Sequence, residues 1–145
     1  MDLLGKTVLE LKALLDTKAV SSEELVEYFL ERIGAKDTDL HAFLTIPAKE
    51  DIVNPVKKGL LAGIPLAIKD NFCTTGIRTT ASAMVLDNFI APYDATVIAR
   101  LKKEGAIVLG KTNMDAWAHG SSTETSDYGP THNPCLLYTS PSPRD

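Results

Sequence analysis

Two amphipathic segments open the chain. Thr7 and Glu10 stand three residues apart, and Ser21 and Glu24 repeat this spacing, which is typical of a capping box at the start of a helix. Apolar residues follow each box at helical spacing. The pattern predicts one helix after Thr7 and a second after Ser21, with Gly34 as the C-cap of the second. Because each helix has a single apolar stripe, both must pack against other elements.

Short apolar runs farther along the chain predict strands, at residues 42–46, 63–68 and 106–110. The interval 72–93 is rich in threonine and turn residues and predicts a loop. We expect Asp94 to N-cap a third helix that ends at Gly105, and residues 113–118 to add a helical turn or two. Strands and helices in this order indicate an α/β layered fold.

Length, composition and charge narrow the class of protein. The chain of 145 residues suits one domain, and 44% hydrophobic with 23% charged residues is ordinary for a globular protein. A net charge of −4 argues against a dominant polyanion-binding face. No apolar run suits a signal peptide or a membrane span, and Cys73 and Cys135 form no metal-ligand or disulfide pattern. We therefore expect a cytoplasmic protein with no metal site here.

Lys69 is the most informative candidate for chemistry, because it ends the buried run of the second predicted strand. Burial disfavours the charged form of an amine, so a desolvated lysine can act as a general base, alone or with a serine. The alternative is a lysine whose amine extends to water from a buried stem. Asp70 and Asn71 follow directly and either orient Lys69 and its loop or form an ordinary turn.

A second candidate is the small, hydroxyl-rich turn formed by Gly120, Ser121, Ser122 and Thr123. Such a turn can approach a bound amide closely and offer backbone donors. The alternative is a structural turn.

Other polar residues are weaker candidates. Lys111 ends the third predicted strand, and we expect a structural role for it. His119 and His132 flank the hydroxyl-rich turn without an acidic partner at a suitable spacing, and Cys73 is expected to be a small buried apolar residue.

Five segments together resemble the amidase signature family. They are residues 63–71, 76–80, 93–96, 110–115 and 120–124. The longer stretch 120–134 is similar in particular to the glutaminase subunits of tRNA-dependent amidotransferases within that family. The resemblance implies a mixed central sheet covered by helices, of which this chain holds the N-terminal part.

The resemblance also implies a Ser–cis-Ser–Lys triad for amide hydrolysis. Lys69 would activate the nucleophilic serine through a bridging serine, with Asp70 and Asn71 in support and Gly120, Ser121, Ser122 and Thr123 against the substrate. Both catalytic serines are expected after Pro134, so we expect the chain alone to be inactive and to fold poorly.

The implied reaction is glutamine hydrolysis. The ammonia would pass to partner B and C subunits, which convert Glu-tRNA(Gln) to Gln-tRNA(Gln) with ATP and Mg²⁺. The glutaminase subunit itself would need no cofactor, and we expect no membrane partner. Two alternatives stay open: a general amidase of the same family, and a short non-catalytic binding module.

The last eleven residues differ in character from the rest. Residues 135–145 resemble a translated sequencing adapter. We expect residues 1–134 to be the N-terminal part of a single amidase domain and 135–145 to be non-native.

Overall fold

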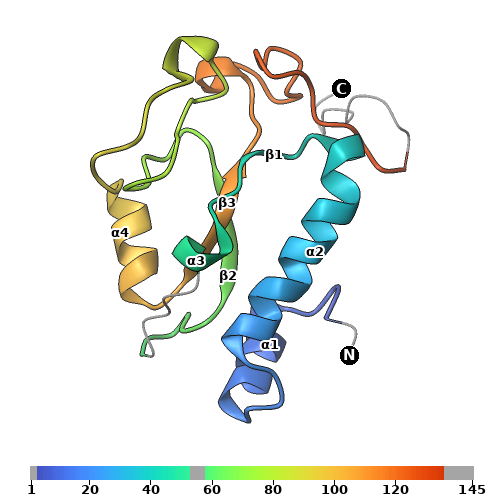
Figure 1. Cartoon of the computed structure of the whole chain (residues 1–145), viewed down its shortest axis with the longest axis vertical. Coiled ribbons are helices and arrows are strands. Elements are labelled where there is room, and N and C mark those ends of the chain that lie inside the picture. The colour runs from blue at the N-terminus through green and yellow to red at the C-terminus, as the bar shows by residue number, and fades with distance from the viewer. Residues whose placement is uncertain (1–2, 53–57, 136–145) are drawn as a thin grey trace.

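The fold is a small mixed sheet flanked by helices. The computed structural model describes residues 3–52 and 58–135. Three strands lie in the order β1 (Phe43–Thr45), β3 (Ile107–Thr112) and β2 (Pro65–Lys69). β3 pairs parallel with β2 and antiparallel with β1, so the predicted mixed α/β fold is confirmed. In Figure 1 the sheet stands between α2 (Ser22–Leu40) and α4 (Thr96–Lys103).

Both predicted capping boxes are present. Thr7 N-caps α1 (Val8–Asp16) and Ser21 N-caps α2. In each box the cap oxygen accepts the N–H of the glutamate three residues on, and that glutamate accepts the N–H of the cap residue, at 2.7 Å in α1 and 2.8 Å in α2. Backbone donors that the first turn of a helix leaves unpaired are therefore satisfied by local sequence alone.

The prediction that Gly34 ends α2 is wrong. The helix continues through Gly34 to Leu40, and His41 ends it in the left-handed region at φ 54°. The Asp37 carboxylate then accepts the N–H groups of Ala42 at 2.8 Å and Phe43 at 3.2 Å, which fixes the exit of the chain. A side chain in the last turn, rather than a glycine, thus determines where the helix stops.

Two buried apolar clusters hold the helices on the sheet. The first joins α1 and α2 to the start of β2, and the second joins α2 and α3 (Lys49–Ile52) to β3. Their buried members are Leu3, Leu11, Val20, Leu25 and Ile64 in the first, and Val26, Ile52, Ile107 and Leu109 in the second. α2 contributes to both, so it is the main element covering this side of the sheet.

The predicted N-cap of α4 is also wrong. Ala95 occupies the cap position without a side-chain cap bond. Asp94 instead accepts the N–H of Thr75 at 2.8 Å and pairs with Lys102, one oxygen lying 2.8 Å from its Nζ. Asp94 therefore ties the preceding loop to the far end of the helix. Gly105, at φ 85°, follows the helix as predicted.

The remaining predictions fall on connections. The interval 72–93 is mostly loop, with a 3₁₀ turn at Met84–Leu86, and the predicted turn after β3 is a 3₁₀ turn at Ala116–Ala118. The short helix α3 was not predicted. Residues 136–145, most of the predicted non-native tail, lie outside the described residues. Across residues 3–52 and 58–135, none of the helices combines the length and apolarity that crossing a bilayer requires.

Candidate active site around Lys69

Lys69 is the last residue of β2, as its place in the sequence predicts, and it pairs with Thr112 of β3. Its side chain is exposed. Within residues 3–52 and 58–135 the amine of Lys69 reaches water, which is the alternative left open above, and its role as a base stays a prediction. The loops that follow β2 and β3 gather at this end of the sheet (Figure 1), as parallel strands require.

The buried lysine of this region is Lys111. Its side chain and that of Asp70 are both 0% exposed, and Lys111 Nζ lies 3.3 Å from Asp70 Oδ1. The same ammonium donates to the Phe72 carbonyl at 2.8 Å and to Thr79 Oγ1 at 2.9 Å. Burial lowers the pKa of Lys111, while the Asp70 carboxylate opposes that shift. Because its amine is enclosed and held by two hydrogen bonds and an ion pair, Lys111 fits the structural role expected for it.

Asp70 also organises the loop that follows. Its Oδ2 accepts the N–H and hydroxyl of Thr80 at 2.8 and 2.6 Å, and the N–H of Ser82 lies at 3.4 Å. Ala81 and Ser82 are held at positive φ, 50° and 54°, directly beside it. Asp70 is thus far more than an ordinary turn residue, whereas Asn71 is exposed.

The hydroxyl-rich turn is built around Asp115, a residue that was not predicted to belong to the site. Asp115 is 4% exposed, and its carboxylate accepts the N–H of Thr123 at 2.9 Å and both donors of Thr125, the hydroxyl at 2.8 Å. Burial alone raises the pKa of Asp115, but the donors of Thr123 and Thr125 outweigh it and lower that pKa. A Cβ on Gly120 would lie 2.5 Å from Asp115 Cγ. Position 120 therefore requires glycine because the backbone there lies so close to the Asp115 side chain.

Asn113 joins this turn to the rest of the site. Its Oδ1 accepts the hydroxyls of Ser82 at 3.2 Å and Ser126 at 2.7 Å, and its Nδ2 donates to the Gly129 carbonyl at 2.8 Å. Polar residues directly after a buried strand, such as Asn113 and Asp115, are the sequence signal that could have identified both.

A cavity of about 270 Å³ lies where these loops meet. It is lined by Asp70, Asn71, Cys73, Thr79, Ala81, Leu86, Phe89, Trp117 and Ala118. The structure therefore brings the predicted supporting residues Asp70 and Asn71 to one cavity with Ala118, two residues before the turn. Gly120, Ser121, Ser122 and Thr123 are not among its lining residues.

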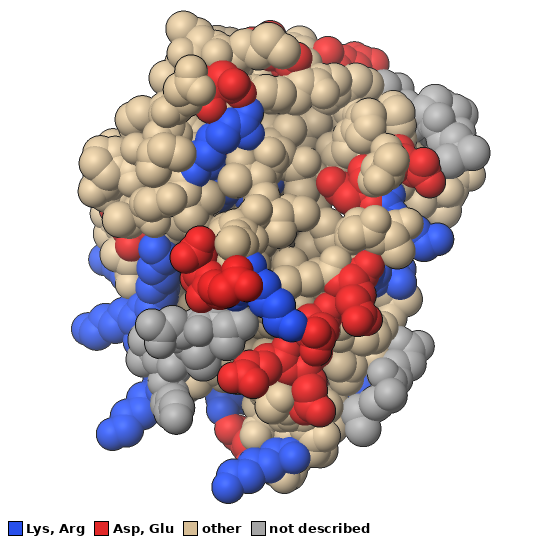
Figure 2. Space-filling view, in the orientation of Figure 1, with Lys and Arg blue, Asp and Glu red and all other residues tan. Residues whose placement is uncertain are grey.

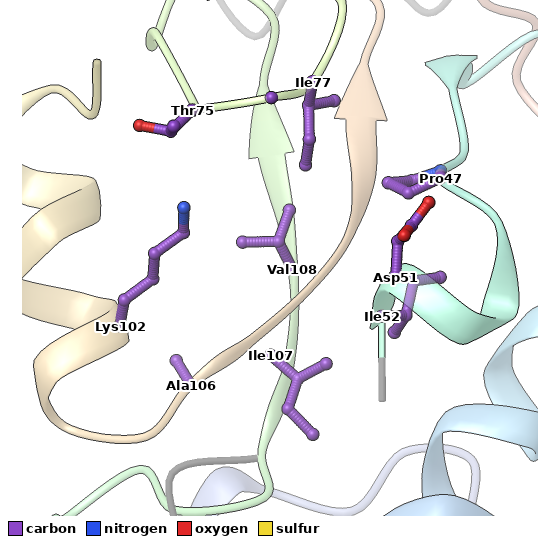
Figure 3. Close-up of a pocket in the computed structure, with 10 residues that line it drawn as sticks. Pro47, Asp51, Ile52, Thr75, Ile77, Lys102, Ala106, Ile107 and Val108 are labelled. Carbon is purple, nitrogen blue, oxygen red and sulfur yellow. The ribbon is translucent and has the colours of Figure 1, made fainter. Parts of the chain in front are cut away.

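A larger cavity, about 440 Å³, lies on the sheet between α3 and α4 (Figure 3). Ile107 and Val108 form its floor, Ile52 stands on one side, and Lys102 points in from α4. None of the predicted site residues lines this cavity.

On the face in Figure 2, acidic residues gather over α2 and α3, while lysine and arginine side chains project along the lower left edge. The acidic residues include Glu23, Glu27 and Glu50, around a Lys49 amine that pairs with Glu27 at 2.6 Å. Among residues 3–52 and 58–135, no group of three or more potential ligands could hold a metal ion.

Comparison with known proteins decides the family. The amidase family matches residues 24–141. The glutamyl-tRNA(Gln) amidotransferase A-subunit of Saccharolobus solfataricus is 51% identical over 132 residues, which cover 88% of this chain and 28% of that relative. The chain belongs to the amidase family. It therefore spans little more than a quarter of the length of this relative.

Solved structures of the amidase family share the fold. The glutamyl-tRNA(Gln) amidotransferase A-subunit of Thermotoga maritima is 40% identical with a TM-score of 0.78, over 92% of this chain and 29% of that one. A 6-aminohexanoate cyclic dimer hydrolase is 26% identical with a TM-score of 0.83, over 91% and 28%. These matches confirm the predicted fold; the roles of Lys69, Asp70, Asn71 and the turn from Gly120 to Thr123 stay predictions.

Proposed function

We propose that the complete protein carrying this segment is the glutaminase subunit of a tRNA-dependent amidotransferase. The observation that carries the proposal is the 51% identity, across 88% of the chain, to the glutamyl-tRNA(Gln) amidotransferase A-subunit of Saccharolobus solfataricus. The substrate is glutamine, and the ammonia released from it converts Glu-tRNA(Gln) to Gln-tRNA(Gln) in a complex with B and C subunits. ATP and Mg²⁺ act in the complex, and the glutaminase needs no cofactor of its own.

Amide hydrolysis needs a nucleophile, a base and oxyanion donors. In this proposal Lys69 is the base, acting through a bridging serine on a nucleophilic serine, and both serines come from beyond this chain. A lysine acts as a base in its unprotonated form, which burial favours. Since Lys69 is exposed here, the remainder of the protein must cover it in the working enzyme.

The turn from Gly120 to Thr123 is the proposed wall of the glutamine site. The Asp115 carboxylate accepts hydrogen bonds from Thr123 and Thr125 on the inner side of the turn. In this proposal the outer side of the turn faces the substrate. The acid-rich surface over α2 and α3 supports a division of labour in which a partner protein of the complex binds the tRNA.

A second candidate is a general amidase acting on small amides. The TM-score of 0.83 to 6-aminohexanoate cyclic dimer hydrolase favours it, because that enzyme shares the same layout of strands and loops.

Ammonia release from glutamine by the complete protein distinguishes the two. The rate should rise when the B and C subunits and Glu-tRNA(Gln) are added together with ATP. Hydrolysis of small amides at a rate indifferent to these additions would instead identify a general amidase. The absence of any amide turnover, with or without partners, would leave a binding role.

A further inference from the structure

The residue after the proposed base is anchored more firmly than the base itself. Asp70 donates its N–H to the Thr112 carbonyl at 3.1 Å, which extends the β2–β3 pairing one step past Lys69. Its side chain is fully buried against Lys111, whereas Lys69 is exposed. The backbone at Lys69 is therefore held from its C-terminal side by the Asp70–Lys111 pair.

Lys111 binds two segments at once. Its contacts reach Asp70 and Phe72 in the turn directly after Lys69, and Thr79 at the start of the following loop. The turn is closed by the N–H of Phe72, which donates to the Lys69 carbonyl at 3.1 Å. Loss of the ammonium would release the turn from the loop and leave a buried carboxylate without its cation.

An irregularity in the sheet aims Lys111 at these segments. The pairing of β2 with β3 runs from Val108 to Gly110 and skips Leu109. Successive side chains along a strand point to opposite faces of the sheet. One extra residue in β3 therefore moves the side chains after it to the face opposite the one that regular alternation would give them. Ile107 and Leu109 pack with α2, while Lys111 contacts the Phe72 and Thr79 segments instead.

We propose that the Asp70–Lys111 ion pair is a positioning pair for Lys69. It fixes the direction in which Lys69 leaves the sheet, and neither member exchanges protons with the substrate. This inference rests on the proposed function, in which Lys69 is the base.

The test uses the complete protein in its amidotransferase complex and measures kcat and KM for glutamine. Lys111→Met keeps an apolar stem of similar length and removes the ammonium. A misplacement of about 1 Å costs about 100-fold in rate, so kcat should fall by about 100-fold while KM changes by less than about threefold. Lys102→Met, which breaks the Asp94 ion pair on α4, is the matched control and should leave both constants unchanged.

A second variant protects the test against simple misfolding. Asp70→Asn/Lys111→Met buries no charge and should fold, because an uncompensated buried charge is the costly feature of the single variant. It still lacks the bonds from the ammonium, so its kcat should also be low at an unchanged KM. A folded double variant with the kcat of the parent would overturn the positioning role. Lys69→Ala in parallel separates the two claims: full activity there would remove the proposed function, whereas loss there with full activity in the double variant would remove only this inference.

Discussion

The ammonium of Lys111 and the carboxylate of Asp70 form an ion pair at 3.3 Å, and both side chains are fully buried. Such a pair contributes little net stability compared with well-packed apolar residues, but breaking it is costly. Its value here is that it joins β3 to the turn behind Lys69.

Stability measurements should show this asymmetry. Lys111→Met should lower the free energy of unfolding of the complete protein by about 3–5 kcal/mol, because Asp70 is left buried and unpaired. Adding Asp70→Asn should recover part of that loss. Urea unfolding of Asp70→Asn, Lys111→Met and the double variant provides the cycle, and a loss in the double variant equal to the sum of the two single losses would mean that the charges are not coupled.

Gly120→Ala should destabilise the hydroxyl-rich turn. The added Cβ would lie 2.5 Å from Asp115 Cγ, closer than side-chain carbons approach one another. We expect a loss of about 1–3 kcal/mol in the free energy of unfolding, since overpacking forces neighbours to move. Thermal melting measures it, and an unchanged melting temperature would show that Asp115 does not pack against Gly120.

Gly34→Ala should have the opposite effect. Gly34 lies inside α2, and a Cβ there would meet nothing within 4 Å. Replacing a mid-helix glycine by alanine stabilises by about 0.5–1 kcal/mol. The same melting experiment serves as the check, and a loss of stability would mean that the helix ends at Gly34 after all.

The helix boundaries show which parts of the fold could be predicted from the sequence. Both capping boxes depend on residues three apart and were predicted correctly. The end of α2 and the partner of Asp94 depend on Asp37 and Lys102, which act through side-chain contacts that helical spacing does not reveal. Signals between residues three apart therefore predicted the starts of α1 and α2, whereas the start of α4 and the end of α2 depend on longer-range side-chain contacts and were missed.

The residues of the candidate site also differ in whether the sequence could predict their place. The place of Lys69 at the end of β2 follows from its apolar run, and this was predicted. The burial of Lys111 and the central place of Asp115 depend on contacts with residues distant in the sequence, such as Thr79, which lies 32 positions before Lys111. No periodicity in the strand distinguishes the buried lysine from the exposed one.

The Asp115 carboxylate gives a pH-dependent prediction. Its pKa in the folded protein is lowered, so its stabilising contribution is complete above the pKa of an unfolded aspartate, about 3.9, and is lost as the pH falls below that value. Asp115→Asn should therefore be destabilised at pH 7 by about 1.5–3 kcal/mol, the range for hydrogen bonds to a charged group, and by less at about pH 3.5. Urea unfolding of both proteins at these pH values tests it, and a constant difference would contradict the lowered pKa.

The central claim is that Lys69 is the catalytic base of a glutaminase, and kcat for glutamine in the Lys69→Ala variant of the complete protein tests it most directly. Lys103→Ala, at an exposed lysine of α4, is the control for loss of a surface charge. Loss of one triad member costs several orders of magnitude, so kcat should fall by about a thousandfold or more in Lys69→Ala and stay unchanged in Lys103→Ala. A Lys69→Ala protein that releases ammonia at the rate of the parent would contradict the account.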